Sequence, residues 1–137
     1  MEGTMKDFTN EDNDIDELTT IVIGRAFKVH STLGSGFLES VYMNALLYEL
    51  ADSGLTVEPE AALSVIYEGE IVGRFFADLI VDRRLIVELK AVERLSLIHE
   101  VQLVNYLKAT GIQDGLLINF GSSKVEVKRK FRSKKLL

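Results

Sequence analysis

The chain has 137 residues, of which 47% are hydrophobic and none is cysteine. This composition predicts a single domain with an adequate apolar core, and it excludes disulfides, thiolate metal sites and cysteine nucleophiles. No apolar run reaches the length of a membrane span, and the acidic N-terminal segment does not resemble a signal peptide. We therefore expect a cytoplasmic protein that makes no membrane contact.

The net charge of -5 is unevenly distributed along the chain. Acids are concentrated in residues 1–18, whereas bases are concentrated in residues 124–137. Such asymmetry marks either a tail that interacts with a polyanion or a solvated terminal strand. Taken alone, the charge pattern favours the solvated strand.

The first half of the chain predicts a disordered tail and two helices. Residues 1–12 are polar, and we expect them to be disordered. Apolar residues then recur at helical spacing over residues 15–33 and again over residues 38–51, with glycines following both segments.

The second half predicts five strands and one helix. Residues 57–69, 70–82 and 83–92 are expected to form strands, joined by turns at Glu68-Gly69 and Asp82-Arg83. Residues 95–111 return to helical period, residues 114–121 predict a buried strand, and residues 124–132 predict an edge strand. The order ααβββαββ predicts an α/β fold with a mixed sheet flanked by helices. One domain would cover residues 13–132, followed by a basic C-terminal tail at 133–137.

The stretch VDRRLIVELKA, residues 81–91, places charged side chains within an apolar strand. Glu88 and Lys90 share one face of that strand, and a hairpin would bring Asp78 close to them from the preceding strand. Buried charge is costly, so either Lys90 forms a structural ion pair or the two carboxylates hold Mg²⁺ (or Mn²⁺) for phosphodiester hydrolysis. The pattern Asp-x₉-Glu-x-Lys is short and leaves both interpretations open.

Two further groups of residues favour the metal site. Glu39 follows a glycine-rich turn at the start of the second helix, where an acid is also favoured by the helix dipole. Gln102 and Tyr106 lie one turn apart on the third helix and share a stripe with His99. A glutamine and a tyrosine there can hold a catalytic group or a phosphate, whereas His99 is better explained as a capping or surface residue.

Three motifs carry a resemblance to a known family, over roughly residues 15–130. GSGFLESVY, with Gly36, Glu39 and Tyr42, resembles the signature of the GxxExxY family of the PD-(D/E)xK nuclease superfamily. Asp78, preceded by alanine in place of proline, corresponds to the PD element, and residues 88–90 correspond to (D/E)xK. The segment 102–106, QLVNY, resembles the QxxxY motif of the RecB-like branch.

The resemblance implies a restriction-endonuclease-like fold and a metal-dependent DNA nuclease, either an exonuclease or a structure-specific enzyme. It implies these roles: Asp78, Glu88, Glu39 and the carbonyl of Leu89 as metal ligands, Lys90 as the catalytic lysine, and Gln102 and Tyr106 as supporting residues. The expected partners are DNA and either a second copy of the chain or a larger DNA-processing protein. The alternatives are a non-catalytic module that binds nucleic acid or protein, and a metal-free domain with a buried ion network.

Overall fold

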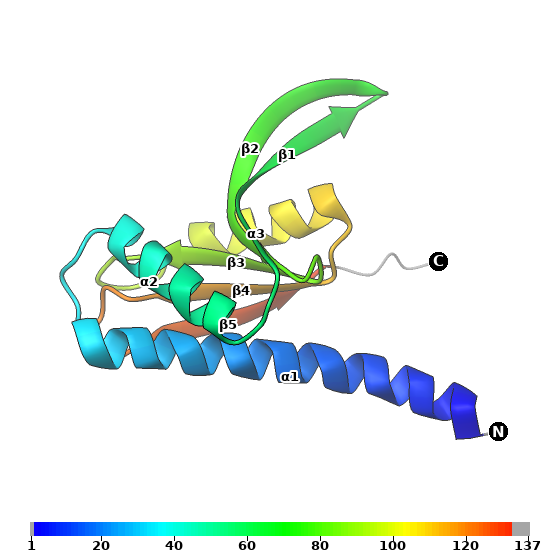
Figure 1. The fold of residues 1–137 in the computed structure, drawn as a ribbon. Coiled ribbons are helices and arrows are strands. Elements are labelled where there is room, and N and C mark those ends of the chain that lie inside the picture. Colours follow the sequence, from blue (N-terminus) through cyan, green and yellow to red (C-terminus); the bar gives the residue numbers. More distant parts are fainter. Residues whose placement is uncertain (1, 133–137) are drawn as a thin grey trace.

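The computed structural model describes residues 2–132, with side chains from residue 14 onward. The predicted basic tail, residues 133–137, lies outside the described residues. The helices and strands follow the predicted order ααβββαββ (Figure 1). They are α1 (Glu2–Leu33), α2 (Glu39–Asp52), β1 (Val57–Tyr67), β2 (Glu70–Val81), β3 (Leu85–Lys90), α3 (Leu97–Thr110), β4 (Asp114–Asn119) and β5 (Glu126–Phe131).

The first helix is longer than the sequence predicted. We expected residues 1–12 to be disordered, whereas α1 begins at Glu2. The segment contains no proline, so no residue in it blocks a helical backbone hydrogen bond. The prediction relied on apolar periodicity, and an existing helix propagates without apolar residues because each added residue gains one hydrogen bond.

The five described strands form one mixed sheet in the order β1-β2-β3-β4-β5. Neighbouring strands are antiparallel except β3 and β4, which run parallel and are connected through α3. The C-terminal ends of the parallel strands β3 and β4 therefore lie at the same end of the sheet, where Lys90 pairs with Asn119. β4 is buried throughout and β5 is an edge strand, and both findings confirm the predictions.

Helices cover both faces of the sheet (Figure 1). One face packs with α1 and α2 around the buried side chains of Tyr42, Leu89 and Phe120. The other face packs with α3 through a smaller cluster that includes Ala77, Ile80 and Leu103. None of the helices in the described part of the chain combines the length and apolar character that a membrane crossing requires.

The β1–β2 hairpin continues beyond the sheet as a curved arm, residues 61–77, which rises past α3 in Figure 1. β3 pairs with β2 only between residues 79 and 81, so the two strands of the arm pair with each other alone. Many apolar side chains on the arm are exposed, namely Val65, Ile66, Tyr67, Ile71, Val72 and Phe76.

Candidate active site

Asp78 and Glu88 lie opposite each other on β2 and β3. The antiparallel register pairs Leu79 with Val87, so the next positions along the two strands are Asp78 and Glu88. The Asp78 N–H donates to Oε2 of Glu88 over 2.6 Å, and the Leu89 N–H donates to Oδ2 of Asp78 over 2.8 Å. The backbone of each strand therefore holds the carboxylate of the other, and the predicted hairpin register is confirmed.

The alternation of side chains along β2 breaks at Asp78. Ala77 and Ile80 both pack in the cluster under α3, although residues three apart on a regular strand point to opposite faces. Across the ladder, Glu60 has a φ of 48°, while the β1–β2 pairs on either side of it stay in register. Both strands therefore turn locally at this point, where the sheet ends and the arm begins.

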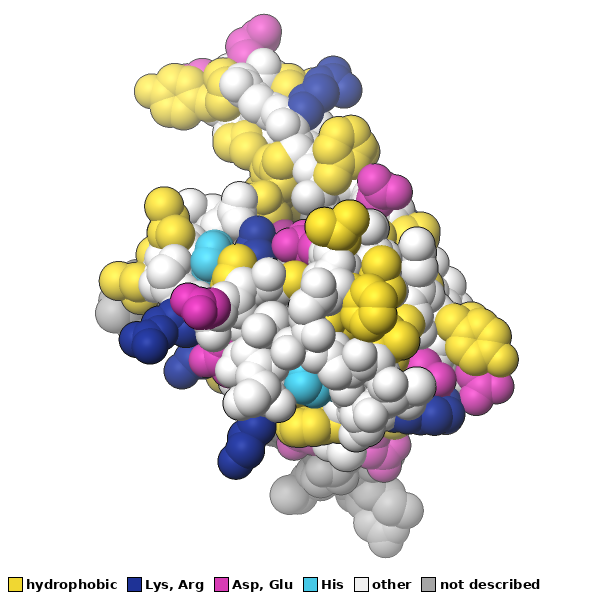
Figure 2. Space-filling view, turned by 90° about the vertical axis from the view of Figure 1, so that its left-hand side faces the viewer, with side chains coloured by type: hydrophobic (Ala, Val, Ile, Leu, Met, Phe, Trp, Pro, Cys, Tyr) yellow, Lys and Arg dark blue, Asp and Glu magenta, His cyan; other side chains and the backbone are white. Residues whose placement is uncertain are grey.

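Lys90 and Glu39 lie close enough to the carboxylate pair to affect its protonation. Lys90 ends β3 on the same face as Glu88 and is half-buried, and Glu39 is the exposed first residue of α2. Burial raises the pKa of Glu39, Asp78 and Glu88, and the charge of Lys90 opposes that rise in all three. The structure thus brings together four of the residues that the sequence singled out, and Figure 2 shows charged side chains of both signs at the foot of the arm.

Burial dominates the protonation of the acids. Burial, followed by the neighbouring charge of Asp78, raises the pKa of Glu88 to about 8, against the opposing effects of the Asp78 N–H bond and the charge of Lys90. Burial likewise raises the pKa of Asp78, against the opposing effect of the Leu89 N–H bond. The pKa of Glu39 is raised by partial desolvation and then by the charge of Asp78. Because Lys90 is the cation facing these three acids, the cluster favours either a proton or an added cation.

The donor set fits a hard divalent cation in kind. Asp78 and Glu88 offer carboxylate oxygens at adjacent positions of the ladder, which is the chemistry that Mg²⁺ requires. Within the described residues, however, no group of three or more His, Cys, Asp or Glu side chains is already arranged around a metal position. Leu89 contacts the pair through its N–H, and its carbonyl remains a proposed ligand.

Tyr42 positions the loop that leads to Glu39. Its hydroxyl donates to the carbonyl of Gly34 over 2.6 Å and accepts the N–H of Phe37 over 3.2 Å. Gly36, between them, has a φ of 110°, which glycine adopts without strain. The ring of Tyr42 is fully buried and stacks on Phe120 at 4.8 Å. The glycine and tyrosine of this motif therefore fix the position of its glutamate.

Asn119 is a residue of the site that the sequence reasoning missed. It is fully buried beside Lys90, and it both accepts the N–H of Val92 (2.9 Å) and donates to the Val92 carbonyl (2.8 Å). Its side chain therefore replaces a strand partner just after β3 ends. Gly121 is required nearby, because a Cβ there would lie 2.3 Å from the Val92 oxygen. The sequence does contain a signal for this role, namely an asparagine at the end of a segment that predicts a buried strand.

The predicted residues of α3 divide into two groups. The pKa of Tyr106 is raised by burial and then by the charges of Glu88 and Asp78, so its hydroxyl experiences the field of the carboxylate pair. Its ring stacks on Phe75 at 4.1 Å and lines a groove of about 670 Å³ between α3 and the arm. Gln102 is exposed. His99 caps α3 by accepting the Ser96 N–H over 3.2 Å, as expected.

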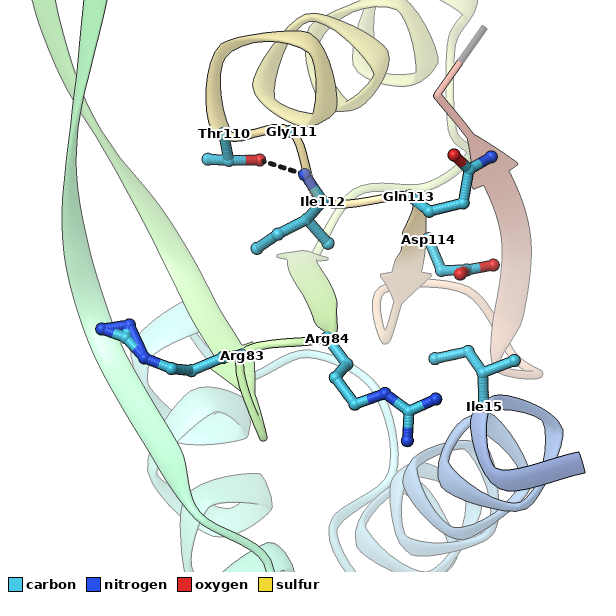
Figure 3. A pocket seen from close by; sticks show the side chains of 8 residues that line it. All are labelled: Ile15, Arg83, Arg84, Thr110, Gly111, Ile112, Gln113 and Asp114. Carbon is cyan, nitrogen blue, oxygen red and sulfur yellow. Dashed lines mark hydrogen bonds between the residues drawn. The ribbon is translucent and has the colours of Figure 1, made fainter. Parts of the chain in front are cut away.

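A separate cavity of about 370 Å³ lies at the opposite end of the sheet (Figure 3). Arg83 and Arg84 line it, but Figure 3 shows their side chains pointing in different directions. Arg83 is also paired with Glu58 at 3.4 Å. The cavity therefore does not gather two guanidinium groups around one anion, and its lining includes none of the predicted site residues.

Comparisons with known proteins agree with this geometry. The family model of the PD-(D/E)XK nuclease superfamily matches residues 16–130. No curated protein matches the chain. A solved structure titled "Crystal structure of SSO0001" is 16% identical with a TM-score of 0.58, and the match covers 70% of this chain and 50% of that one. The chain thus spans half the length of that protein, and the likeness shows the fold alone. The mixed sheet flanked by helices is consistent with the restriction-endonuclease-like fold of the superfamily.

Proposed function

Because this chain belongs to the PD-(D/E)XK nuclease superfamily, we propose that it is a metal-dependent DNA nuclease that hydrolyses phosphodiester bonds. We assign it further to the GxxExxY family and to the RecB-like branch, on its residues 34–42 and 102–106. The observation that carries the proposal is the contact between Asp78 and Glu88 just beyond the end of the β2–β3 ladder, with Lys90 on the same face as Glu88. The absence of cysteine supports a cytoplasmic location.

The proposed metal is Mg²⁺ or Mn²⁺, held by Asp78 and Glu88 with help from Glu39 and the Leu89 carbonyl. When bound, such an ion neutralises charge on a phosphate and lowers the pKa of a bound water. Lys90 would donate from its ammonium group to the attacking water or to a phosphate oxygen, and so stabilise negative charge that develops in the transition state.

The supporting residues have narrower proposed roles. Tyr106, which lies near both carboxylates, would donate from its hydroxyl toward the phosphate. Gln102, one turn earlier on α3 and exposed, is placed to contact the DNA backbone rather than the reacting atoms. The proposed partners are DNA and a second copy of the chain or a larger DNA-processing protein.

The main competing function is a non-catalytic module that binds nucleic acid or protein on the nuclease fold. One observation favours this alternative. Each carboxylate already accepts a backbone N–H, and these hydrogen bonds offset part of the cost of burying the two acids without any metal. A metal-free ion network involving Asp78, Glu88 and Lys90 would explain the same bonds. Metal binding distinguishes these alternatives, because an ion that binds only the folded state raises the melting temperature.

The decisive experiment compares Lys90→Ala with Glu88→Ala in a metal-dependent cleavage assay. Loss of Glu88 removes a metal ligand, so a higher Mg²⁺ concentration should restore part of the activity. Loss of Lys90 should lower turnover about 10²–10³-fold while metal binding persists, by analogy with loss of one oxyanion donor. Metal binding is read from the shift in melting temperature.

The same two variants can refute the proposal. If wild-type protein cleaves neither DNA nor RNA with Mg²⁺ or Mn²⁺, and its melting temperature does not respond to millimolar metal, the nuclease assignment fails. The ion-network alternative predicts in addition that both substitutions destabilise the fold similarly, because each leaves a buried charge unpaired.

A further inference from the structure

An exposed phenylalanine lies next to the carboxylate pair. Phe76 precedes Asp78 by two residues on β2, which corresponds to a Cα separation of roughly 7 Å. Ala77, between them, is fully buried in the cluster under α3, so Phe76 points away from α3. Its neighbour Phe75 stacks on Tyr106, whereas Phe76 is 64% exposed. Phe76 is one of several exposed apolar side chains on the arm, and an exposed apolar patch of this kind marks an interaction site.

A cation is present on the same side of the arm. Arg74 lies two residues before Phe76 in the regular part of the β1–β2 ladder, so their side chains share a face. Arg74 is exposed, and it forms none of the salt bridges found among the described side chains. A guanidinium group and an aromatic ring therefore share one face of the arm, just before β2 turns at Asp78.

A second exposed aromatic residue lies beside Glu39. Phe37 is 49% exposed and belongs to the loop that Tyr42 holds through its hydroxyl, so the ring is displayed from a fixed backbone. Phe37 and Phe76 come from different elements, each two residues before an acid of the cluster. Figure 2 shows apolar side chains both on the arm above the charged group and beside it.

We propose that Phe76, assisted by Phe37 and Arg74, forms a stacking platform for an unpaired nucleobase, so that the substrate is single-stranded nucleic acid. This inference rests on the proposed nuclease function. The acidic cluster itself repels phosphates, so affinity must come from groups around it. Stacking on aromatic rings supplies that affinity for any base, and Arg74 supplies a phosphate contact. A base inside a duplex has both faces covered by its neighbours, and only an unpaired base can use the platform.

Binding without metal isolates the platform from catalysis. The probe is a fluorescent oligothymidine strand in EDTA, compared with the same strand in a duplex and with an abasic strand of equal length. Phe76→Leu should weaken binding of the single strand about 5- to 100-fold, as expected for the loss of one stacked base. Phe76→Trp should retain it. Abasic and duplex probes should bind Phe76→Leu and wild type equally.

The matched control is Phe131→Leu, because Phe131 is similarly exposed, at 53%, but pairs with Asp114 at the opposite end of the sheet. Melting temperatures establish that each variant is folded. The proposal is overturned if Phe76→Leu binds the single strand like wild type, or loses affinity equally for the abasic strand. It is also overturned if sedimentation shows that the wild type is a dimer and Phe76→Leu is a monomer, because a second copy would then cover the arm in the wild type.

This test fails separately from the proposed function. Stacking without any metal-dependent cleavage by the wild type would refute the nuclease while leaving the platform intact. Cleavage that depends on Lys90 but is indifferent to Phe76 would refute the platform while leaving the nuclease intact.

Discussion

Glu88 is the described residue whose pKa rises to a value in the neutral range on folding. Its side chain is buried opposite Asp78, and together these effects raise its pKa from 4.5 to about 8. A raised pKa in the folded state means that the folded protein binds the proton more tightly than the unfolded chain. The resulting stabilisation is present at low pH and is lost as the pH rises through the folded-state pKa.

The metal-free protein should therefore lose stability between pH 4.5 and about pH 8. The free energy of unfolding should fall by up to about 1.4 kcal/mol per pH unit, because only the unfolded chain releases this proton freely. Glu88→Gln should flatten the dependence, and so should a saturating divalent ion. Denaturant unfolding in EDTA across this range measures the slope. A slope that Glu88→Gln leaves unchanged, while the exposed control Glu93→Gln behaves like wild type, would assign the effect to other acids.

Asn119 should be as important to stability as an apolar core residue. It supplies both hydrogen bonds of Val92 at the point where β3 loses its strand partner. Asn119→Leu keeps the branched shape of the side chain but leaves the partly buried N–H and carbonyl of Val92 unpaired, which should cost about 2–4 kcal/mol. The matched control is Asn105→Leu, at an exposed position of α3. Chemical unfolding measures both, and equal losses in the two variants would contradict the assigned role.

Among the residues of the site, the charged side chains within an apolar strand are the ones that the sequence identifies. Glu88 and Lys90 stand out because burial of charge requires compensation, and the hairpin turn located Asp78 opposite them. Tyr42 and Asn119 were harder to interpret because their partners are backbone groups of other segments. No local sequence pattern predicts which carbonyl will accept a hydrogen bond from a buried hydroxyl or amide after folding.

At the scale of elements, a charge network joins the first helix to the last strand. Arg129 on β5 contacts Asp16 on α1 at 3.1 Å and Asp114 on β4 at 3.4 Å. Asp16 is largely exposed, whereas Asp114 is buried, so the two pairs differ in energetic weight. The contact with Asp114 matters more, because a buried carboxylate without a partner is costly.

Arg129→Met should therefore destabilise the protein by about 1–2 kcal/mol, mainly by leaving Asp114 unpaired. Asp16→Asn should cost less than about 1 kcal/mol, because that carboxylate is solvated without its partner. Lys128→Met, at the adjacent exposed position, is the control and should be close to neutral. Thermal unfolding distinguishes these expectations. Equal losses for Asp16→Asn and Arg129→Met would show that α1 docking, not Asp114, sets the cost.

Local sequence patterns predict the order of the helices and strands, but they do not predict the curvature of the β1–β2 arm. Helical and strand periods and glycine-containing turns were sufficient to predict ααβββαββ. The sequence predicts the arm only as an ordinary pair of strands, because alternation continues along it. Its curvature depends on the local turn of both strands at Asp78 and Glu60, and Glu60 adopts a positive φ that its residue type does not indicate. Contacts with α3, distant in sequence, bury one side of the bend.

At the scale of the whole molecule, the structure changes the expectation for the basic C-terminal segment. Two of its bases are already paired with acids of the same chain: Arg129 with Asp16 and Asp114, and Lys130 with Glu100 at 3.0 Å. Lys124 and Lys128 are exposed. The segment is therefore less cationic toward a ligand than its composition indicates, and its contribution to DNA binding must come from particular lysines.

Each of those lysines that contacts a phosphate should contribute to the salt dependence of binding, because neutralising a phosphate releases counterions. Replacing Lys124 or Lys128 with glutamine should reduce the slope of log K against log salt by up to about 0.9 on duplex DNA, or about 0.7 on single strands. Arg129→Gln should leave the slope unchanged, because the Arg129 guanidinium is already paired with Asp16 and Asp114. Removal of residues 133–137 should lower the slope without altering the shift in melting temperature caused by metal.

Titrations in EDTA at several salt concentrations measure these slopes. If neither the lysine substitutions nor the truncation changes the slope, the basic segment is a solvated strand end, and phosphate contacts must come from elsewhere on the molecule.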